Sequence, residues 1–132
     1  IWPAAHYVAL ANALDDCFDA VVLLGNAADA KAGEEMQSAI ALPSVNLMGH
    51  TSLLGAAAAL AECSFFVGND SGLGHLAAAV GARSVTVFGP GRPARYRPWG
   101  SRASLVMAPA LDLARLTPDT VAAHVRERLA LP

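Results

Sequence analysis

The sequence has few charged residues and no concentrated basic segment. Charged residues make up 15% of the chain and the formal net charge is -2, whereas nucleic-acid binding depends on clustered lysine and arginine. We therefore expect no nucleic-acid partner. The longest apolar stretch, residues 52–68, is rich in alanine and is interrupted by Glu62 and by the polar pair Cys63-Ser64, so it is too polar to predict a membrane-spanning helix. These features favour a soluble, cytoplasmic protein.

The sequence is also poor in residues that bind metals or form disulfides. Its two cysteines, Cys17 and Cys63, lie far apart and form no C-x-x-C pair, so neither a zinc site nor a redox motif is indicated. We expect two buried thiols. The histidines His6, His50 and His124 show no metal-ligand spacing, and we expect a structural role for His124. The sequence thus predicts no metal and no cofactor.

The length of the chain limits how many domains it can form. A chain of 132 residues has the size of one ordinary domain and can bury a core without disulfides or metals. We expect residues 1–132 to form a single domain. The chain begins at Ile1-Trp2-Pro3 without an initiator methionine, and we expect it to be a piece of a longer protein.

Short apolar runs alternate with longer helical patterns along the whole chain. The patterns predict helices at residues 4–14, 27–40, 52–61, 73–80 and 118–129. They predict strands at residues 19–25, 44–47, 65–68, 84–88 and, weakly, around 105–106, with a long loop at residues 89–102. The continuously apolar run at 19–25 is typical of a strand buried on both faces of a parallel sheet. The alternation predicts an α/β fold with a doubly wound parallel sheet, whose ligands bind outside the carboxyl ends of the strands.

The segment FVGNDSGLGH, at residues 66–75, is the most informative one for function. An apolar strand runs directly into small and polar residues and then into a helix. The first N–H groups of a helix have no partner within it, and the helix dipole places partial positive charge there, so such a junction attracts a phosphate. Gly72 and Gly74 lack a Cβ and permit close approach.

Two polar side chains of this segment are candidates for ligand contacts. Asp70 could accept hydrogen bonds from sugar hydroxyls, and His75 could donate to a phosphate oxygen. The alternative is that Asp70 or Ser71 is an ordinary N-cap residue and that His75 is an ordinary helix residue.

A longer stretch around this segment matches a known signature. The sequence NDSGLGHLAAAVG at residues 69–81, followed by VTVFGP at residues 85–90, resembles the signature of glycosyltransferase family 9, the ADP-heptose:lipopolysaccharide heptosyltransferases. The resemblance extends to LMGHTSL at residues 47–53, to Trp2-Pro3 with the helix that follows, and to the glycine-ended strand at Leu24-Gly25. It therefore covers nearly the whole chain.

This resemblance implies a fold and a set of binding residues. The family has the GT-B architecture, in which two Rossmann-like domains face a cleft, and this chain resembles the C-terminal domain, which binds the nucleotide-sugar donor. The first strand of that domain would precede Ile1. The resemblance implies that the donor-binding residues are Asp70 at the sugar; Ser71, Gly72 and His75 around the diphosphate, with Leu73 and Gly74 between them; Asp29 at the ribose; and Met48, Gly49 and Thr51 at the nucleobase.

The resemblance also implies a reaction and its partners. The family transfers a heptose or a related sugar from a nucleotide diphosphate to a lipopolysaccharide core acceptor, with inversion and without a metal. The general base belongs to the N-terminal domain, so we expect no catalytic residue in this chain and no activity from it alone. The implied location is the cytoplasm, with peripheral association of the full-length enzyme at the inner face of the bacterial inner membrane.

The loop at residues 89–102 is rich in arginine and aromatic residues. Arg92, Arg95 and Arg97 could pair bidentately with acidic acceptor groups or donor phosphates. The alternative is a solvated loop, or a contact with the domain that this chain lacks.

Two other functions are compatible with the motif. Non-hydrolysing UDP-GlcNAc 2-epimerases share the fold and carry a D-S-G-G turn, but the second glycine of that turn is Leu73 here. A nucleotide-sugar binding module without catalysis is the other alternative.

Overall fold

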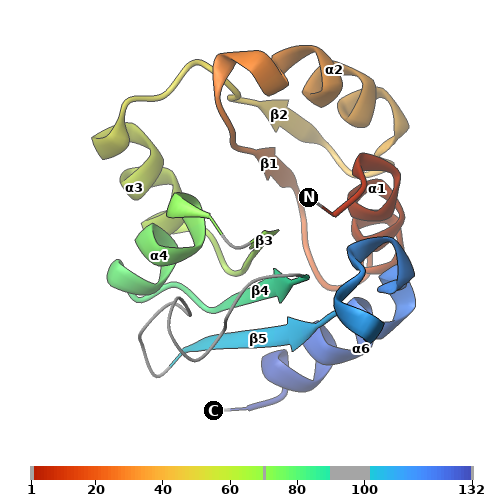
Figure 1. The fold of residues 1–132 in the computed structure, drawn as a ribbon. Coiled ribbons are helices and arrows are strands. Elements are labelled where there is room, and N and C mark those ends of the chain that lie inside the picture. Colours follow the sequence, from red (N-terminus) through yellow and green to blue (C-terminus); the bar gives the residue numbers. More distant parts are fainter. Residues whose placement is uncertain (1, 70, 90–101, 132) are drawn as a thin grey trace. The chain divides into compact units, whose positions relative to one another are not determined.

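The computed structural model describes residues 2–69, 71–89 and 102–131, and these form an α/β fold (Figure 1). The chain divides into two compact units. The β1–β2 unit consists of Pro3–Ser52 and Thr117–Pro132, and the β3–β5 unit consists of Ile1–Trp2 and Leu53–Leu116. The prediction that residues 1–132 form one donor-binding domain stays a prediction.

The β1–β2 unit contains a parallel pair of strands with three α-helices. Its elements are α1 (Ala4–Ala13), β1 (Val21–Leu23), the 3-10 helix η1 (Ala27–Asp29), α2 (Ala30–Ala39), β2 (Ser44–Asn46) and α6 (Pro118–Leu129). The strands are in register from Val21 opposite Ser44 to Leu23 opposite Asn46. The α2 crossover between them is the connection that a parallel pair requires.

The core of this unit lies on one face of its two strands. Leu23 packs with Met36, Ile40 and Met48, and side chains of α1 pack against this cluster. Val22 points to the opposite face, because side chains alternate along a strand. Val22 is 40% exposed and its register partner Val45 is 52% exposed. The prediction that the strand at residues 19–25 is buried on both faces is therefore wrong: the strand spans residues 21–23 and only one face is covered.

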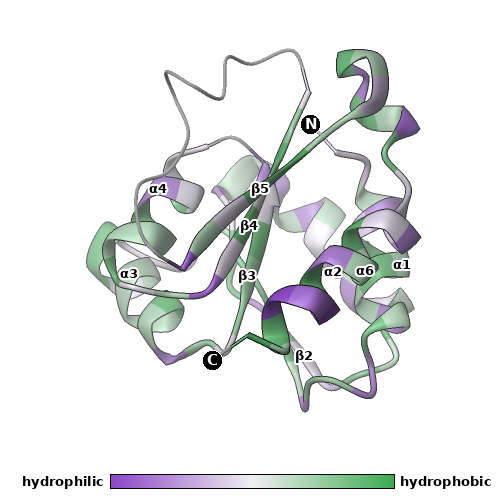
Figure 2. Ribbon diagram, turned by 90° about the horizontal axis from the view of Figure 1, so that it is seen from below, coloured by the Kyte–Doolittle hydropathy of each residue, from purple (hydrophilic) through white to green (hydrophobic). Residues whose placement is uncertain are grey.

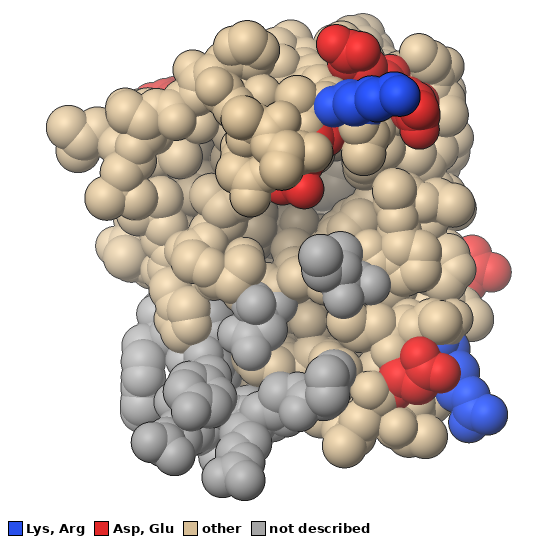
Figure 3. Space-filling view, turned by 45° about the horizontal axis from the view of Figure 1, so that its top comes forward, with Lys and Arg blue, Asp and Glu red and all other residues tan. Residues whose placement is uncertain are grey.

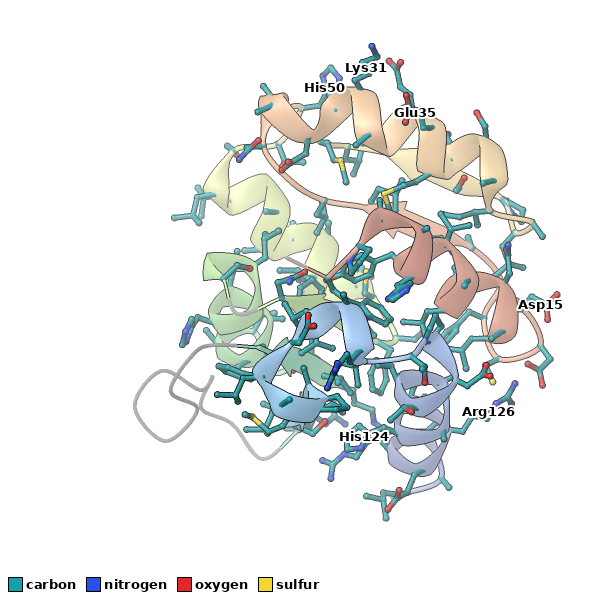
Figure 4. All side chains as sticks on the ribbon, turned by 45° about the vertical axis from the view of Figure 1, so that its right-hand side comes forward. Asp15, Lys31, Glu35, His50, His124 and Arg126 are labelled. Carbon is teal, nitrogen blue, oxygen red and sulfur yellow. The ribbon has the colours of Figure 1, made fainter. Side chains whose placement is uncertain are left out.

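An ion pair joins the two terminal helices of the β1–β2 unit. The guanidinium of Arg126 donates to both carboxylate oxygens of Asp16, at 2.8 and 3.1 Å, and to the Ala13 carbonyl at 2.9 Å. Arg126 extends from α6 toward the end of α1, near Asp15 (Figure 4). Its hydrogen bonds lower the pKa of the Asp16 carboxyl below its usual value. The fork of donors thus fixes the end of α1 and satisfies one of its last carbonyls.

The β3–β5 unit contains a three-stranded parallel sheet in the order β3-β4-β5. Its elements are α3 (Leu53–Glu62), β3 (Phe66–Asn69), α4 (Gly72–Ala79), β4 (Ser84–Phe88), β5 (Ala103–Met107) and the 3-10 helices η2 (Pro109–Leu111) and η3 (Leu113–Arg115). Every residue of the central strand β4 is buried, as expected for a strand with neighbours on both sides and cover on both faces. Figure 2 shows β4 and α3 in mostly hydrophobic colours.

Trp2, the second residue of the chain, is part of the β3–β5 unit. Its side chain is fully buried, and its indole Nε1–H donates to the Leu116 carbonyl at 2.9 Å. A buried tryptophan needs such a partner for its one polar atom. Trp2 therefore connects the start of the chain to the segment that follows β5.

Most sequence-based boundaries agree with the structure. The predicted α/β fold with parallel strands is confirmed, and β4 and α6 have the predicted bounds. The helix predicted at residues 27–40 begins as the 3-10 helix η1 and continues as α2, while η2 and η3 were not predicted. No helix in the described part of the chain is both long and apolar enough to cross a membrane.

The burial of the two cysteines differs from what the sequence predicts. Neither Cys17 nor Cys63 forms a disulfide, and each is only half-buried, so the prediction of two buried thiols is wrong. The reason is their position after the ends of α1 and α3, where the chain leaves the packed face of a helix. Partial burial still raises the pKa of the Cys63 thiol.

Candidate functional site

The junction between β3 and α4 has the geometry of an anion site. Ser71 occupies the N-cap position with extended backbone angles, φ -155° and ψ 174°, but its side chain makes no capping hydrogen bond. The first turn of α4 contains no acidic residue. The Ser71 side chain therefore accepts no hydrogen bond from the amide groups that open α4, which have no partner within the helix. This end of the helix can accept an anionic ligand.

The residues of this junction differ in exposure. Ser71, Gly72 and His75 are exposed, Leu73 is half-buried and Gly74 is buried. A Cβ on Gly72 would meet no atom within 4 Å, so space adjoins the backbone at the first residue of α4. The structure thus brings the predicted diphosphate residues Ser71, Gly72 and His75 together on one accessible turn.

The β1–β2 unit brings together a second group of predicted residues, Asp29, Met48 and Gly49. Two of them flank Gly25, at the end of β1: a Cβ there would lie 3.0 Å from Asp29 Oδ2 and 3.3 Å from Met48 Cγ. The Gly49 N–H donates to the Gly25 carbonyl at 3.0 Å. The segments after the two parallel strands therefore meet at the same edge, as they do in the ligand sites of α/β sheets. Thr51, also predicted, lies half-buried two residues beyond Gly49.

Asp29 has a structural contact that the sequence analysis did not predict. Its Oδ2 accepts a hydrogen bond from the Asn26 N–H at 3.2 Å, as part of a reciprocal capping box that begins η1. The side chain is exposed. Because an ionised carboxylate can accept several hydrogen bonds, this cap fixes Asp29 and leaves capacity for ligand hydroxyls.

Gly49 occupies a position that other residues would strain. Its φ is +76°, and a Cβ would lie 2.7 Å from the Ala27 Cα. Both the left-handed backbone and the close approach to η1 require glycine. The turn after β2 is therefore fixed against the segment that carries Asp29.

Asn46, the last residue of β2, and Gly33 on α2 have contacts that the sequence did not predict. Asn46 accepts a hydrogen bond from the Met48 N–H and donates to the Ala30 carbonyl, both at 3.0 Å. A Cβ on Gly33 would lie 2.6 Å from Met48 Sδ and 2.7 Å from Asn46 Nδ2. The only sequence signal was an asparagine at a strand end, since asparagine is uncommon within strands.

We predict that Gly33→Ala destabilises the protein, although glycine to alanine in a helix ordinarily stabilises by up to about 1 kcal/mol. The new methyl group would push against an amide that two hydrogen bonds hold in place, and such overpacking costs roughly 1–3 kcal/mol. Urea denaturation followed by circular dichroism measures the change. Gly72→Ala, into open space, is the control and should lose no stability. A Gly33→Ala midpoint equal to or above the wild-type value would contradict the prediction.

Some predicted residues lie outside the described part of the chain. They are Asp70, Arg92, Arg95 and Arg97.

Within residues 2–69, 71–89 and 102–131, no group of three or more His, Cys, Asp or Glu side chains is placed to hold a metal ion. Burial lowers the pKa of His124 on α6. On the face shown in Figure 3, charged side chains are few among the described residues.

Parallel α/β units with an open helix N-terminus after a strand define a class of nucleotide- and phosphate-binding proteins. Comparison with known proteins narrows this class: the family model described as glycosyltransferase family 9 (heptosyltransferase) matches residues 1–121. The chain belongs to this family. The predicted fold class, a Rossmann-like half of a GT-B fold, agrees with the solved relatives.

Individual relatives that are similar to this chain are heptosyltransferases as well. Lipooligosaccharide heptosyltransferase 2 of Haemophilus influenzae is 40% identical over 111 residues, which are 80% of this chain and 32% of that protein. A structure of Escherichia coli ADP-heptose lps heptosyltransferase II superposes with a TM-score of 0.86 at 35% identity, over 97% of this chain and 41% of that one. The structure of Escherichia coli heptosyltransferase WaaC with ADP superposes with a TM-score of 0.87 at 29% identity, over 96% of this chain and 39% of that one. The chain thus spans 32% to 41% of these relatives' lengths.

Proposed function

We propose that this chain is the donor-binding half of an inverting glycosyltransferase, which transfers a heptose or a related sugar from a nucleotide diphosphate to a lipopolysaccharide core acceptor. The observation that carries the proposal is the start of α4 directly after β3, where the Ser71 side chain makes no capping hydrogen bond, in a chain of the heptosyltransferase family. The solved relative with ADP supports a nucleoside diphosphate as the ligand.

In this proposal the residues of the α4 junction act on the diphosphate. The amides at Gly72 and Leu73 would hold phosphate oxygens, and the exposed His75 would donate a further hydrogen bond. Charge that develops on the departing diphosphate is then stabilised by fixed dipoles, without a bound metal. Asp70 would orient the transferred sugar.

The residues of the β1–β2 unit would recognise the nucleoside. Asp29, fixed by its cap, would accept from the ribose hydroxyls, and the backbone of Met48 to Thr51 would line the nucleobase pocket. The general base that deprotonates the acceptor would come from outside this chain. We further propose that the enzyme acts in the cytoplasm, at the inner face of the inner membrane.

Calorimetry with ADP, GDP and UDP tests the donor site. The protein, at its full natural length, should bind ADP with one site per chain and at least about tenfold more tightly than UDP, because a formed base pocket discriminates between a purine and a pyrimidine. No binding of any of the three nucleotides would defeat the proposal.

Product analysis separates the proposed reaction from its alternatives. Incubation with ADP-heptose and a lipopolysaccharide core acceptor should give sugar transfer. Epimerisation of UDP-GlcNAc would instead indicate the epimerase function, and binding without any product would indicate a binding module.

A further inference from the structure

We infer that Asn46 is a positioning residue for the nucleoside end of the donor site, an inference that rests on the proposed function. Asn46 lies at the end of β2 and is half-buried. Its side-chain amide joins two segments that carry proposed donor contacts: the turn with Met48 and Gly49, and the start of α2 directly after Asp29.

The two hydrogen bonds of Asn46 fix the orientation of its amide. Oδ1 accepts from the Met48 N–H and Nδ2 donates to the Ala30 carbonyl, each at 3.0 Å. A flipped amide would place a donor against the N–H and an acceptor against the carbonyl, so only one orientation satisfies both. One rigid group therefore sets the position of the Met48 backbone relative to the first residue of α2.

The other contacts of the turn act on different backbone atoms. The Leu47 N–H continues the parallel ladder to the Leu23 carbonyl at 2.9 Å, and the Gly49 N–H donates to the Gly25 carbonyl at 3.0 Å. Between them the Met48 N–H turns away from β1 and is held by the Asn46 side chain. Without Asn46, the middle residue of this turn would lose its hydrogen-bond acceptor.

Packing reinforces the position of the amide. Gly33 on α2 exposes its backbone to both Asn46 and Met48, so that no Cβ separates α2 from either side chain. Met48 is itself buried in the core cluster with Leu23 and Met36. The amide is thus partly withdrawn from water, where an unmade hydrogen bond costs more than at the surface.

Asn12 provides a matched control with the same chemistry. Its Nδ2 donates to the Ala39 carbonyl at 3.1 Å, and its Oδ1 accepts from the Ala41 N–H at 2.9 Å. This amide bridges the other end of α2, because the Ala39 carbonyl lies nine residues after the Ala30 carbonyl that Asn46 contacts. Asn12→Ala therefore removes a pair of hydrogen bonds of the same chemistry, in a more exposed position, at the far end of the same helix.

The experiment compares Asn46→Ala with Asn12→Ala in the protein at its full natural length. We expect Asn46→Ala to raise the Kd for ADP and the KM for the sugar donor about tenfold, with kcat changed less than twofold, because a displaced turn weakens ground-state and transition-state binding alike. Inhibition by inorganic pyrophosphate should be unchanged, since it contacts only the α4 junction. Asn12→Ala should leave all four values unchanged. Exchange of the Met48 amide hydrogen should be faster in Asn46→Ala only.

Other outcomes of this experiment would contradict the inference or the proposed function. Wild-type affinity for ADP in Asn46→Ala would overturn the inference, as would an equal loss in Asn12→Ala, because the effect would then be one of general stability. Equal loss of ADP and pyrophosphate affinity would overturn it too. Absence of binding of ADP, GDP and UDP alike to the wild-type protein would overturn the proposed function itself, and with it the inference.

Discussion

Replacing His75 by alanine should lower turnover about a hundredfold or more. His75 is exposed on the first turn of α4, the turn whose amides follow Ser71 and are not capped by the Ser71 side chain. The bond to the departing diphosphate breaks in the transition state, and negative charge increases on the phosphate oxygens. A hydrogen bond donated there strengthens as that charge develops, so its loss acts mainly on kcat.

The measurement is steady-state transfer from ADP-heptose to a lipopolysaccharide core acceptor, with kcat and KM determined separately. His124→Ala is the control, because His124 lies on α6 of the other unit and has no place in the proposed site. It should retain wild-type turnover. A His75→Ala enzyme with near wild-type kcat would remove His75 from the mechanism and leave it as an ordinary helix residue.

Asp70→Ala should cause a loss of similar size, for a different reason. Asp70 is proposed to orient the sugar through its hydroxyls, so its removal should also reduce the fraction of bound donor that reacts. The same transfer assay measures this loss. Near wild-type turnover of Asp70→Ala would refute the proposed contact between Asp70 and the sugar. The proposal for His75 would be unaffected.

Replacing Trp2 by alanine should destabilise the protein by about 3–5 kcal/mol, the range for removing a large buried aromatic residue. Trp2 is fully buried in the β3–β5 unit, and its indole N–H satisfies the Leu116 carbonyl. Alanine would leave both a cavity and an unsatisfied carbonyl. Urea denaturation of purified variants measures the loss.

Trp2→Phe separates the two contributions. Phenylalanine fills most of the space but donates no hydrogen bond, so it should lose roughly 1–2 kcal/mol. Leu54→Ala is the control, because Leu54 is 82% exposed and surface substitutions change stability by less than about 0.5 kcal/mol. A loss under about 1 kcal/mol for Trp2→Ala would show that the N-terminal residues contribute little to the core.

Local sequence patterns predicted the secondary structure because each depends on a few neighbouring residues. The apolar run Ser84–Phe88 forms β4 with the predicted bounds, and Thr117-Pro118 starts α6 where proline and an N-capping threonine favour it. The strand–loop–helix pattern after Phe66 likewise predicted the junction at Ser71. These features depend on backbone propensity and on periodicity, which are properties of consecutive residues.

The sequence by itself determined the order of the main helices and strands, the family and the position of the turn that is proposed to bind phosphate. Only the tertiary structure decided which face of β1 is covered, so that Val22 is exposed while Leu23 is buried, and which side chains hold the turn after β2. The contacts of Asn46 with Ala30 and of Gly33 with Met48 span about fifteen residues. Such contacts depend on how α2 packs against the strands, and no local pattern encodes that packing.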